Sequence, residues 1–167
     1  ITPVEIRAPN IDELPLKKEL PLEYCRRIAE KKIQVLELAD NEIALCADTT
    51  VALGRRILGK PSDRKEASSF LSLLSGRRHK VITCVAVKKQ NQFKVKDVIS
   101  VVKMKVLSFQ EIEDYLDSGD WEGKAGGYAI QGIAASFVNF ISGSYSNVVG
   151  LPLAELYRLL ISIGNFF

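Results

Sequence analysis

The chain has 167 residues, of which 47% are hydrophobic and 26% charged, a balance that suits one globular domain and is too apolar for a disordered chain. The formal net charge is +3, with acidic and basic residues interspersed, so bulk electrostatics gives no reason to expect a nucleic acid partner. No apolar run approaches the roughly 18 residues that a membrane span needs, and no signal-peptide pattern is visible, so we expect no membrane partner.

Three cysteines, Cys25, Cys46 and Cys84, are present, and none forms a C-x-x-C pair. Cys46 and Cys84 lie inside apolar, strand-like runs, which favours small core residues in a reducing, cytoplasmic compartment. With a single histidine and no cluster of ligands, a zinc site is not expected.

The first predicted elements are a short strand at residues 3–7, which alternate in polarity, and a helix from Pro21 to about Leu38. Five residues of this helix have the spacing of one face: Cys25, Ile28, Ala29, Lys32 and Leu36. Lys32 therefore lies on the apolar stripe. It is either a lysine at the edge of the stripe that extends to solvent, or an ammonium pointed into a cleft, and the spacing favours neither.

A strand is expected at Ile43–Asp48, and Thr50–Leu53 either continues it or begins a hairpin. Asp63 with Glu66 three residues later resembles a capping box and predicts a helix to about Leu74.

The second half of the chain predicts an antiparallel hairpin, Val81–Lys89 with Phe93–Val106, and a helix that begins at the capping box Ser108-x-x-Glu111. A last helix follows Pro152, and its expected core stripe consists of Leu153, Leu156, Leu160 and Ile163. Strands and helices alternate without an internal repeat, which predicts one α/β domain.

Asp48 is the first candidate for chemistry, because a carboxylate that closes an apolar strand is typical of ligand sites in α/β enzymes. It can hold Mg²⁺, act as a base, or only cap the following turn. The neighbouring hydroxyls of Thr49 and Thr50 can donate hydrogen bonds to it or to a phosphate.

Two loops supply further candidates. Lys60, between a glycine and a proline, is either a phosphate contact or part of a solvated turn. Gln131 is the last residue but one of the glycine-rich segment 123–132, and we expect it to be partly buried. Its carboxamide has one donor and one acceptor side, which complements uracil or thymine, although a glutamine satisfied by backbone groups fits the same pattern.

Three other polar or aromatic features are expected to be structural. The basic run at residues 75–80 can attract phosphate but is typical of a solvated loop. His79 has no evident acidic partner, and Trp121 is expected to pack in the core.

Four motifs together resemble the Maf family: Ala-Asp-Thr-Thr-Val with Gly-Lys-Pro; Leu-Ser-Gly-Arg-Arg-His-Lys-Val-Ile-Thr; Lys-Ala-Gly-Gly-Tyr-Ala-Ile-Gln-Gly; and Gly-Ser-Tyr-Ser-Asn-Val-Val-Gly-Leu-Pro-Leu. They occur in the family's order and span nearly the whole chain. The resemblance implies a single domain over residues 1–167, akin to inosine triphosphate pyrophosphatases, with a central mixed, twisted sheet flanked by helices and an active-site cleft across it.

The resemblance also implies an activity. Maf proteins are nucleoside triphosphate pyrophosphatases, which use a divalent metal, Mg²⁺ or Mn²⁺, to give a monophosphate and pyrophosphate. The subgroup with Ile-Gln-Gly is associated with dTTP and UTP, and Thr49 and Gln131 match positions linked to base specificity. A homodimer in the cytoplasm is implied as well.

Four more residues acquire roles through the resemblance. Asp48 matches the proposed catalytic base and, together with Glu13, is expected to hold the metal. Lys32 and Lys60 match site lysines and are expected to neutralise the charge on the departing pyrophosphate.

The family also opens with a strand and a Ser-x-Ser-Pro-Arg-Arg-like phosphate-binding segment, which has no match here, so we expect the chain to lack it. Two alternative functions remain open: a nucleotide-binding regulator of septum formation with little turnover, and an enzyme restricted to deaminated purine triphosphates.

Overall fold

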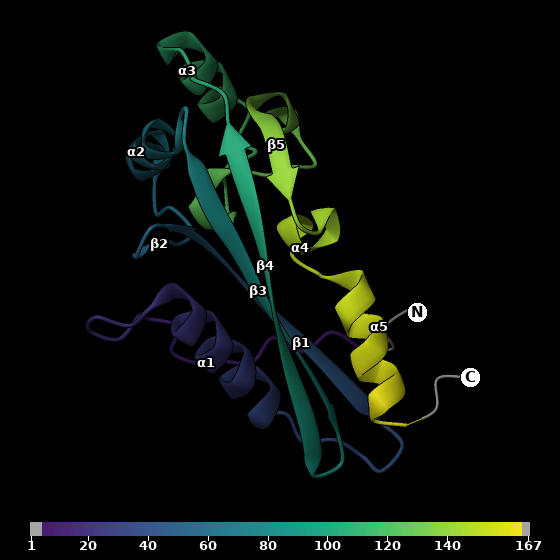
Figure 1. The fold of residues 1–167 in the computed structure, drawn as a ribbon. Helices are drawn as coiled ribbons and strands as arrows, with labels where there is room; N and C mark the ends of the chain where they lie inside the picture. Colours follow the sequence, from purple (N-terminus) through teal and green to yellow (C-terminus); the bar gives the residue numbers. More distant parts are fainter. Residues whose placement is uncertain (1–4, 165–167) are drawn as a thin grey trace.

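Five strands form a twisted sheet in the order β2-β1-β3-β4-β5 in the computed structural model of the chain, which describes residues 5–164 (Figure 1). The strands are β1 (Ile43–Leu53), β2 (Arg56–Leu58), β3 (Arg78–Lys89), β4 (Gln92–Met104) and β5 (Val138–Ser142). The helices are α1 (Pro21–Gln34), α2 (Arg64–Leu74), α3 (Phe109–Asp117), α4 (Tyr145–Val149) and α5 (Leu153–Ser162), with 3₁₀ turns at Ala125–Gly127 and Ile133–Phe137. No helix among these is long and apolar enough to cross a membrane.

The α/β class is confirmed, but the expectation of a mixed sheet is wrong, because every pairing between the described strands is antiparallel. Tight turns of two residues join β1 to β2 and β3 to β4, and a connection this short permits only an antiparallel neighbour. The predicted hairpin is β3–β4, paired from Arg78–Lys103 to Lys89–Gln92.

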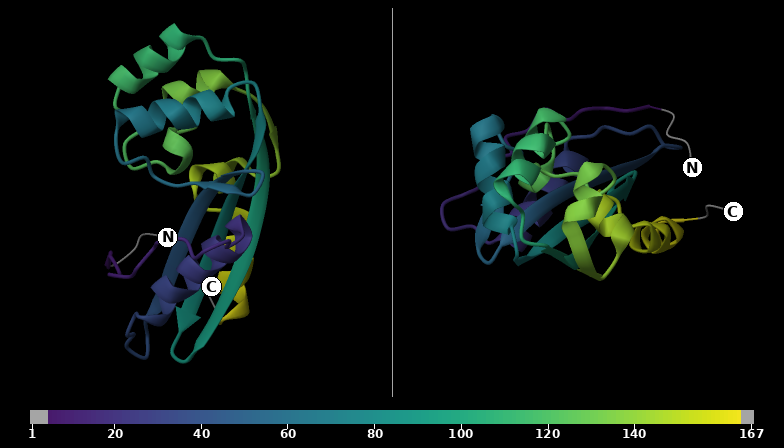
Figure 2. Two further views of the ribbon diagram at one scale, coloured as in Figure 1. Left: turned by 90° about the vertical axis from the view of Figure 1, so that its left-hand side faces the viewer. Right: turned by 90° about the horizontal axis from the view of Figure 1, so that it is seen from above.

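The two faces of the sheet carry different helices. Figure 2 shows α1 in front of the lower half of the sheet and α5 behind it. On β3, Ile82 and Cys84 cluster with α1, whereas Val85 and Val87 cluster with α5. This alternation follows from the two-residue period of a strand, and it decides which side chains of β1 meet which helix.

Helix α1 starts at Pro21 as predicted but ends at Gln34. The next residues leave the helix because Leu36 and Leu38 pack from irregular backbone against a small cluster around Ile33. The strand expected at residues 3–7 is absent from its described part, residues 5–7, while residues 1–4 lie outside the described chain.

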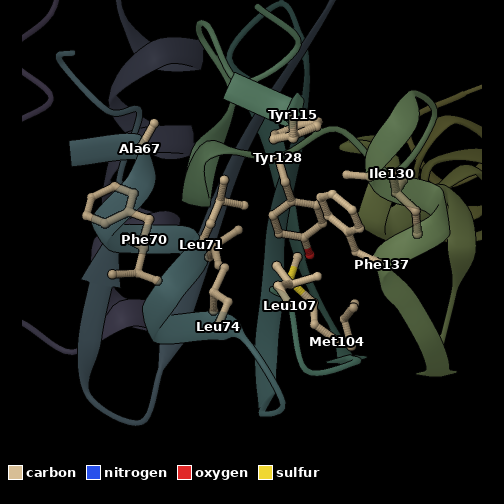
Figure 3. Close-up of a cluster of buried hydrophobic side chains, with 14 of the residues drawn as sticks. Ala67, Phe70, Leu71, Leu74, Met104, Leu107, Tyr115, Tyr128, Ile130 and Phe137 are labelled. Atoms are coloured by element: carbon tan, nitrogen blue, oxygen red, sulfur yellow. The ribbon is translucent and has the colours of Figure 1, made fainter. Parts of the chain in front are cut away.

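The upper half of the molecule holds the largest core cluster, in which α2 packs against aromatic side chains from α3 and the following loops (Figure 3). Both predicted caps are confirmed: Asp63 accepts from the Glu66 amide at 2.8 Å, and Ser108 with Glu111 forms a reciprocal capping box. Trp121 packs against this core, as expected.

The C-terminal part departs from prediction at two points. The short helix α4 was not expected; Ser144 caps it by accepting from the Asn147 amide. In α5 the predicted Leu156 and Leu160 are buried, but Leu153 is 59% exposed, because contact with the sheet begins one turn after the start of the helix.

Candidate active site

A cleft of about 260 Å³ lies at the free edge of β1. β2 pairs only with Val51–Leu53, so among the described strands Ala47–Thr50 has a neighbour on one side only. Successive strand residues face opposite sides, so Asp48 and Thr49 reach the cleft from opposite faces of the sheet. Five of the six predicted site residues line this cleft: Lys32, Asp48, Thr49, Lys60 and Gln131.

Of the two alternatives left open for Thr50–Leu53, the structure shows that it continues the strand, so Asp48 lies in the middle of β1 and not at its end. β1 continues to Leu53 because its pairing with β3 is unbroken and its β-branched residues favour the extended backbone. The carboxylate is nevertheless accessible to a ligand, since the strand edge beside it is open.

Lys32 lies between two carboxylates. Its Nζ is 2.8 Å from Asp48 Oδ1 and 2.8 Å from Glu13 Oε1, and its side chain is 16% exposed. Burial lowers the pKa of Lys32, but the hydrogen bonds and charges of Asp48 and Glu13 outweigh it, so the pKa lies above its ordinary value. The ammonium is therefore charged at neutral pH and points into the cleft, which decides between the two readings of its place on the helix.

The segment that carries Glu13 is held against α1 by backbone contacts. The Tyr24 hydroxyl donates to the Glu13 carbonyl at 2.9 Å, and Arg27 donates to the Leu14 carbonyl at 3.0 Å. Glu13 itself does not line the cleft and reaches it only through Lys32.

Lys60 and Lys124 bring two more cations to the cleft from two loops. The loops are joined where the Gly126 amide donates to the Gly59 carbonyl at 2.9 Å. Gly126 has φ +71°, and a Cβ there would meet the side chain of Val51 at 2.8 Å, so only glycine allows this approach. Sequence reasoning missed Lys124, although its place in a glycine-dense loop was a usable signal.

Apolar side chains also line the cleft, among them Val148 and Val149 of α4 and Ile130 of the loop that follows Tyr128. Thr49 lies near α4, because its hydroxyl is 3.4 Å from the Gly150 carbonyl that follows this helix. Gln131 also lines the cleft but is exposed, which corrects the expectation of partial burial: it lies on an irregular turn rather than on a strand.

His79 is buried behind the cleft, and its Nε2 lies 2.7 Å from the Tyr128 hydroxyl. Burial lowers the pKa of His79 to about 4, so the ring is neutral at physiological pH. The expectation that it is structural agrees with this position. Its neighbours Arg77 and Arg78 are exposed and do not line the cleft.

A larger, open hollow of about 530 Å³ lies at the opposite end of the sheet, between the end of α1 and the β3–β4 turn. Its one lysine, Lys88, donates to the Leu36 carbonyl at 2.6 Å. We place the candidate site in the smaller cleft, because it is lined by three lysines together with Asp48, whereas the one lysine of the larger hollow already bonds to a carbonyl.

The donor set of the cleft fits a magnesium ion that arrives with a nucleotide. Among the described residues no group of three or more His, Cys, Asp or Glu side chains could hold a metal by itself. Mg²⁺ bound to phosphates, however, needs only one or two protein carboxylates, and Asp48 and Glu13 converge on one point at Lys32 Nζ.

A protein-family model described as "Maf-like protein" matches residues 1–163, which is nearly the whole chain. The chain therefore belongs to the Maf family. Among its relatives, a protein of Roseobacter denitrificans named dTTP/UTP pyrophosphatase is 57% identical over 98% of this chain and 87% of the relative. A protein of the same name from Zymomonas mobilis is 52% identical over 98% of this chain and 82% of the relative. A protein of Anaplasma marginale named nucleoside triphosphate pyrophosphatase is 46% identical over 96% of this chain and 83% of the relative.

Proposed function

We propose that this protein hydrolyses dTTP and UTP to the monophosphate and pyrophosphate. The relatives' names support the reaction, and the cleft supports it because both charged and apolar side chains line it. The observation that carries the proposal is the contact of Lys32 with Asp48, which lines the cleft, and with Glu13 beside it, because this contact combines a base, a cation and two possible metal ligands.

The reaction forms a bond between a water oxygen and the α-phosphorus and breaks the bond from the α-phosphorus to the oxygen that bridges to the β-phosphate. Asp48 takes the proton of the water. Its Oδ1 is bonded to Lys32, whereas the nearest side-chain donor to Oδ2 is the Thr50 hydroxyl at 3.5 Å. Oδ2 is therefore the atom with capacity to accept the proton.

Charge accumulates on the pyrophosphate as it leaves. Lys32, Lys60 and Lys124 line the same cleft and stabilise that charge, which is the kind of fixed electrostatic contribution that is commonly the largest in catalysis. Asp48 and Glu13 would hold a divalent ion, Mg²⁺ or Mn²⁺, which when bound neutralises phosphate charge and polarises the reacting phosphoryl group.

A nucleotide panel tests the proposal. Pyrophosphate release is measured with dTTP, UTP, CTP, dGTP and inosine triphosphate, with Mg²⁺ or Mn²⁺, on this chain and on a chain extended by the family's Ser/Arg segment. We expect dTTP and UTP to be the best substrates. Tight binding without pyrophosphate would favour the division regulator, and turnover confined to inosine triphosphate would favour the deaminated-purine reading.

Two further properties belong to the same proposal. We propose a cytoplasmic homodimer, because all three cysteines are free and because three apolar side chains of α4 and α5 are exposed, namely Tyr145, Leu153 and Ile161. Light scattering coupled to gel filtration measures the mass in solution, and a monomer at micromolar concentration would contradict the dimer.

A further inference from the structure

A chain of hydrogen bonds leads from the cleft into the protein behind Thr49. Its hydroxyl lies 3.0 Å from that of Thr83, the residue directly opposite on β3, and 3.4 Å from the Gly150 carbonyl. Thr83 is fully buried and donates to the Asn147 carbonyl at 3.1 Å. Thr83 does not line the cleft, so it can act on a ligand only through Thr49.

The Asn147 carbonyl is held in place. The buried Asn147 amide group donates to the Val81 carbonyl at 3.1 Å and to the Ser100 hydroxyl at 3.0 Å, which ties α4 to both β3 and β4. The same carbonyl also accepts from the Gly150 amide at 3.0 Å. A carbonyl oxygen has two lone pairs, so the Thr83 hydroxyl occupies the second.

Counting protons fixes the polarity of Thr49. Each hydroxyl has one proton to donate. In one arrangement Thr83 donates to the Asn147 carbonyl, and the contact between the two hydroxyls then requires Thr49 to donate to Thr83. In the other arrangement Thr83 donates to Thr49, and the hydroxyl proton of Thr49 then goes to the Gly150 carbonyl. In both arrangements the Thr49 proton is directed into the protein, and a lone pair faces the cleft.

Thr49 therefore favours a ligand group that donates a hydrogen bond over one that accepts. A ligand N–H adds a hydrogen bond to Thr49 and leaves both internal bonds intact. A ligand acceptor can bond to Thr49 only if one internal hydrogen bond is broken, and an internal bond of this kind contributes to stability.

We propose that Thr83 is a positioning residue for base specificity: by fixing Thr49 as an acceptor, it selects bases that present an N–H there. Uracil and thymine have that N–H at N3, whereas N3 of cytosine is an acceptor. The inference rests on the proposed function, which supplies a pyrimidine nucleotide as ligand.

The position of Thr49 suits a base rather than a phosphate. Its hydroxyl faces the Gly150 carbonyl directly after α4, whose Val148 and Val149 line the cleft, whereas Lys32 and Asp48 lie on the opposite face of the sheet. A heterocycle is matched by apolar neighbours with a few polar groups, and a triphosphate by cations.

Gln131 by itself does not provide this selectivity. Within the described chain no side-chain hydrogen bond holds its exposed carboxamide, so the group can turn to offer either its donor or its acceptor side. A carboxamide free to turn matches uracil in one orientation and cytosine in the other. Discrimination requires a partner of fixed polarity, and the network behind Thr49 makes it one.

The test compares Thr83→Val, which keeps the shape and removes the hydroxyl, with Thr83→Ser, which keeps the hydroxyl. Binding of UMP and CMP is measured by calorimetry. The values of kcat and KM are measured with UTP and with CTP as substrates. We expect the preference for UMP over CMP to fall roughly three- to tenfold in the valine variant, the size of one neutral hydrogen bond, and to return in the serine variant. The kcat with UTP should stay unchanged, because the base side does not touch the reacting phosphates.

The proposal would be overturned if Thr83→Val kept the preference for UMP over CMP, or if it weakened the binding of both ligands equally. It would also be overturned if the wild-type protein bound UMP and CMP equally or bound neither. If thermal melting shows that the valine variant is unstable, the binding of N3-methyl-UMP to the wild-type protein is measured instead. N3-methyl-UMP should bind no better than CMP, and binding as tight as that of UMP would refute the inference. Absent pyrophosphate release from UTP would remove the proposed function but leave the binding comparison valid.

Discussion

Lys32 is the residue whose replacement perturbs the site most specifically. Lys32→Met keeps the aliphatic stem that packs along α1 and removes the one ammonium that contacts both Asp48 and Glu13 at 2.8 Å. Two carboxylates are then left without their shared cation, one of them on a side chain that is only 10% exposed.

The cost to stability follows from this partial burial. Breaking a fully buried ion pair costs roughly 3–5 kcal/mol and an exposed pair roughly 0–1 kcal/mol. Asp48 resembles the first case and Glu13, at 41% exposure, the second, so we expect a loss of about 2 kcal/mol. The cost to catalysis is separate: loss of one fixed charge-stabilising group lowers kcat by roughly 10²–10³.

The assay measures pyrophosphate release from dTTP at a temperature where denaturant titration shows the variant to be folded. Lys105→Met is the matched control, because Lys105 also pairs with a carboxylate, Glu111, but does not line the cleft. The control should lose little stability and no activity. A folded Lys32→Met protein with the wild-type kcat would show that the reasoning about this cation is wrong.

Three further predictions concern the parts of the fold that support the cleft. Burial lowers the pKa of His79 from 6.5 to about 4, so as the pH falls the unfolded chain takes up a proton on this residue before the folded protein does. The free energy of unfolding should therefore decrease by about 3 kcal/mol between pH 6.5 and pH 4. Denaturant titration at each pH should show a smaller decrease in His79→Gln. Gly126→Ala should destabilise by roughly 1–3 kcal/mol more than Gly54→Ala, since both residues have positive φ but only the first would meet Val51; equal effects would refute the clash. Asp63→Ala should cost about 1 kcal/mol through its lost cap and leave dTTP turnover unchanged, and lost turnover would show that α2 affects the site.

The caps and the main hairpin could be predicted because their signals are local. Asp63 and Ser108 specify helix starts within four residues, and the apolar alternation on either side of Gln90 specifies the hairpin. The sheet was predicted as mixed, and α4 was missed, because strand direction and a five-residue helix depend on contacts between distant segments rather than on local pattern.

The sequence predicted most of the residues of the site but little of their arrangement in space. The helical spacing of Lys32 already put it on the inward stripe, but its contact with Asp48 depends on how α1 crosses β1. Nothing in the sequence indicated that Asp48 and Thr49 approach the cleft from opposite faces of one strand, because that requires the free edge left by the short β2. The role inferred for Thr83 needs the same geometry.

The central claim is that the Asp48 carboxylate takes the proton of the attacking water, and Asp48→Asn tests it most directly. The amide has nearly the same shape but cannot accept a proton in the same way, so pyrophosphate release from dTTP should fall by roughly 10²–10⁴ in kcat. The matched control is Asp97→Asn, which removes a carboxylate paired with Arg26 outside the cleft and should keep full activity. Turnover of dTTP at the wild-type rate by a folded Asp48→Asn protein would contradict the account.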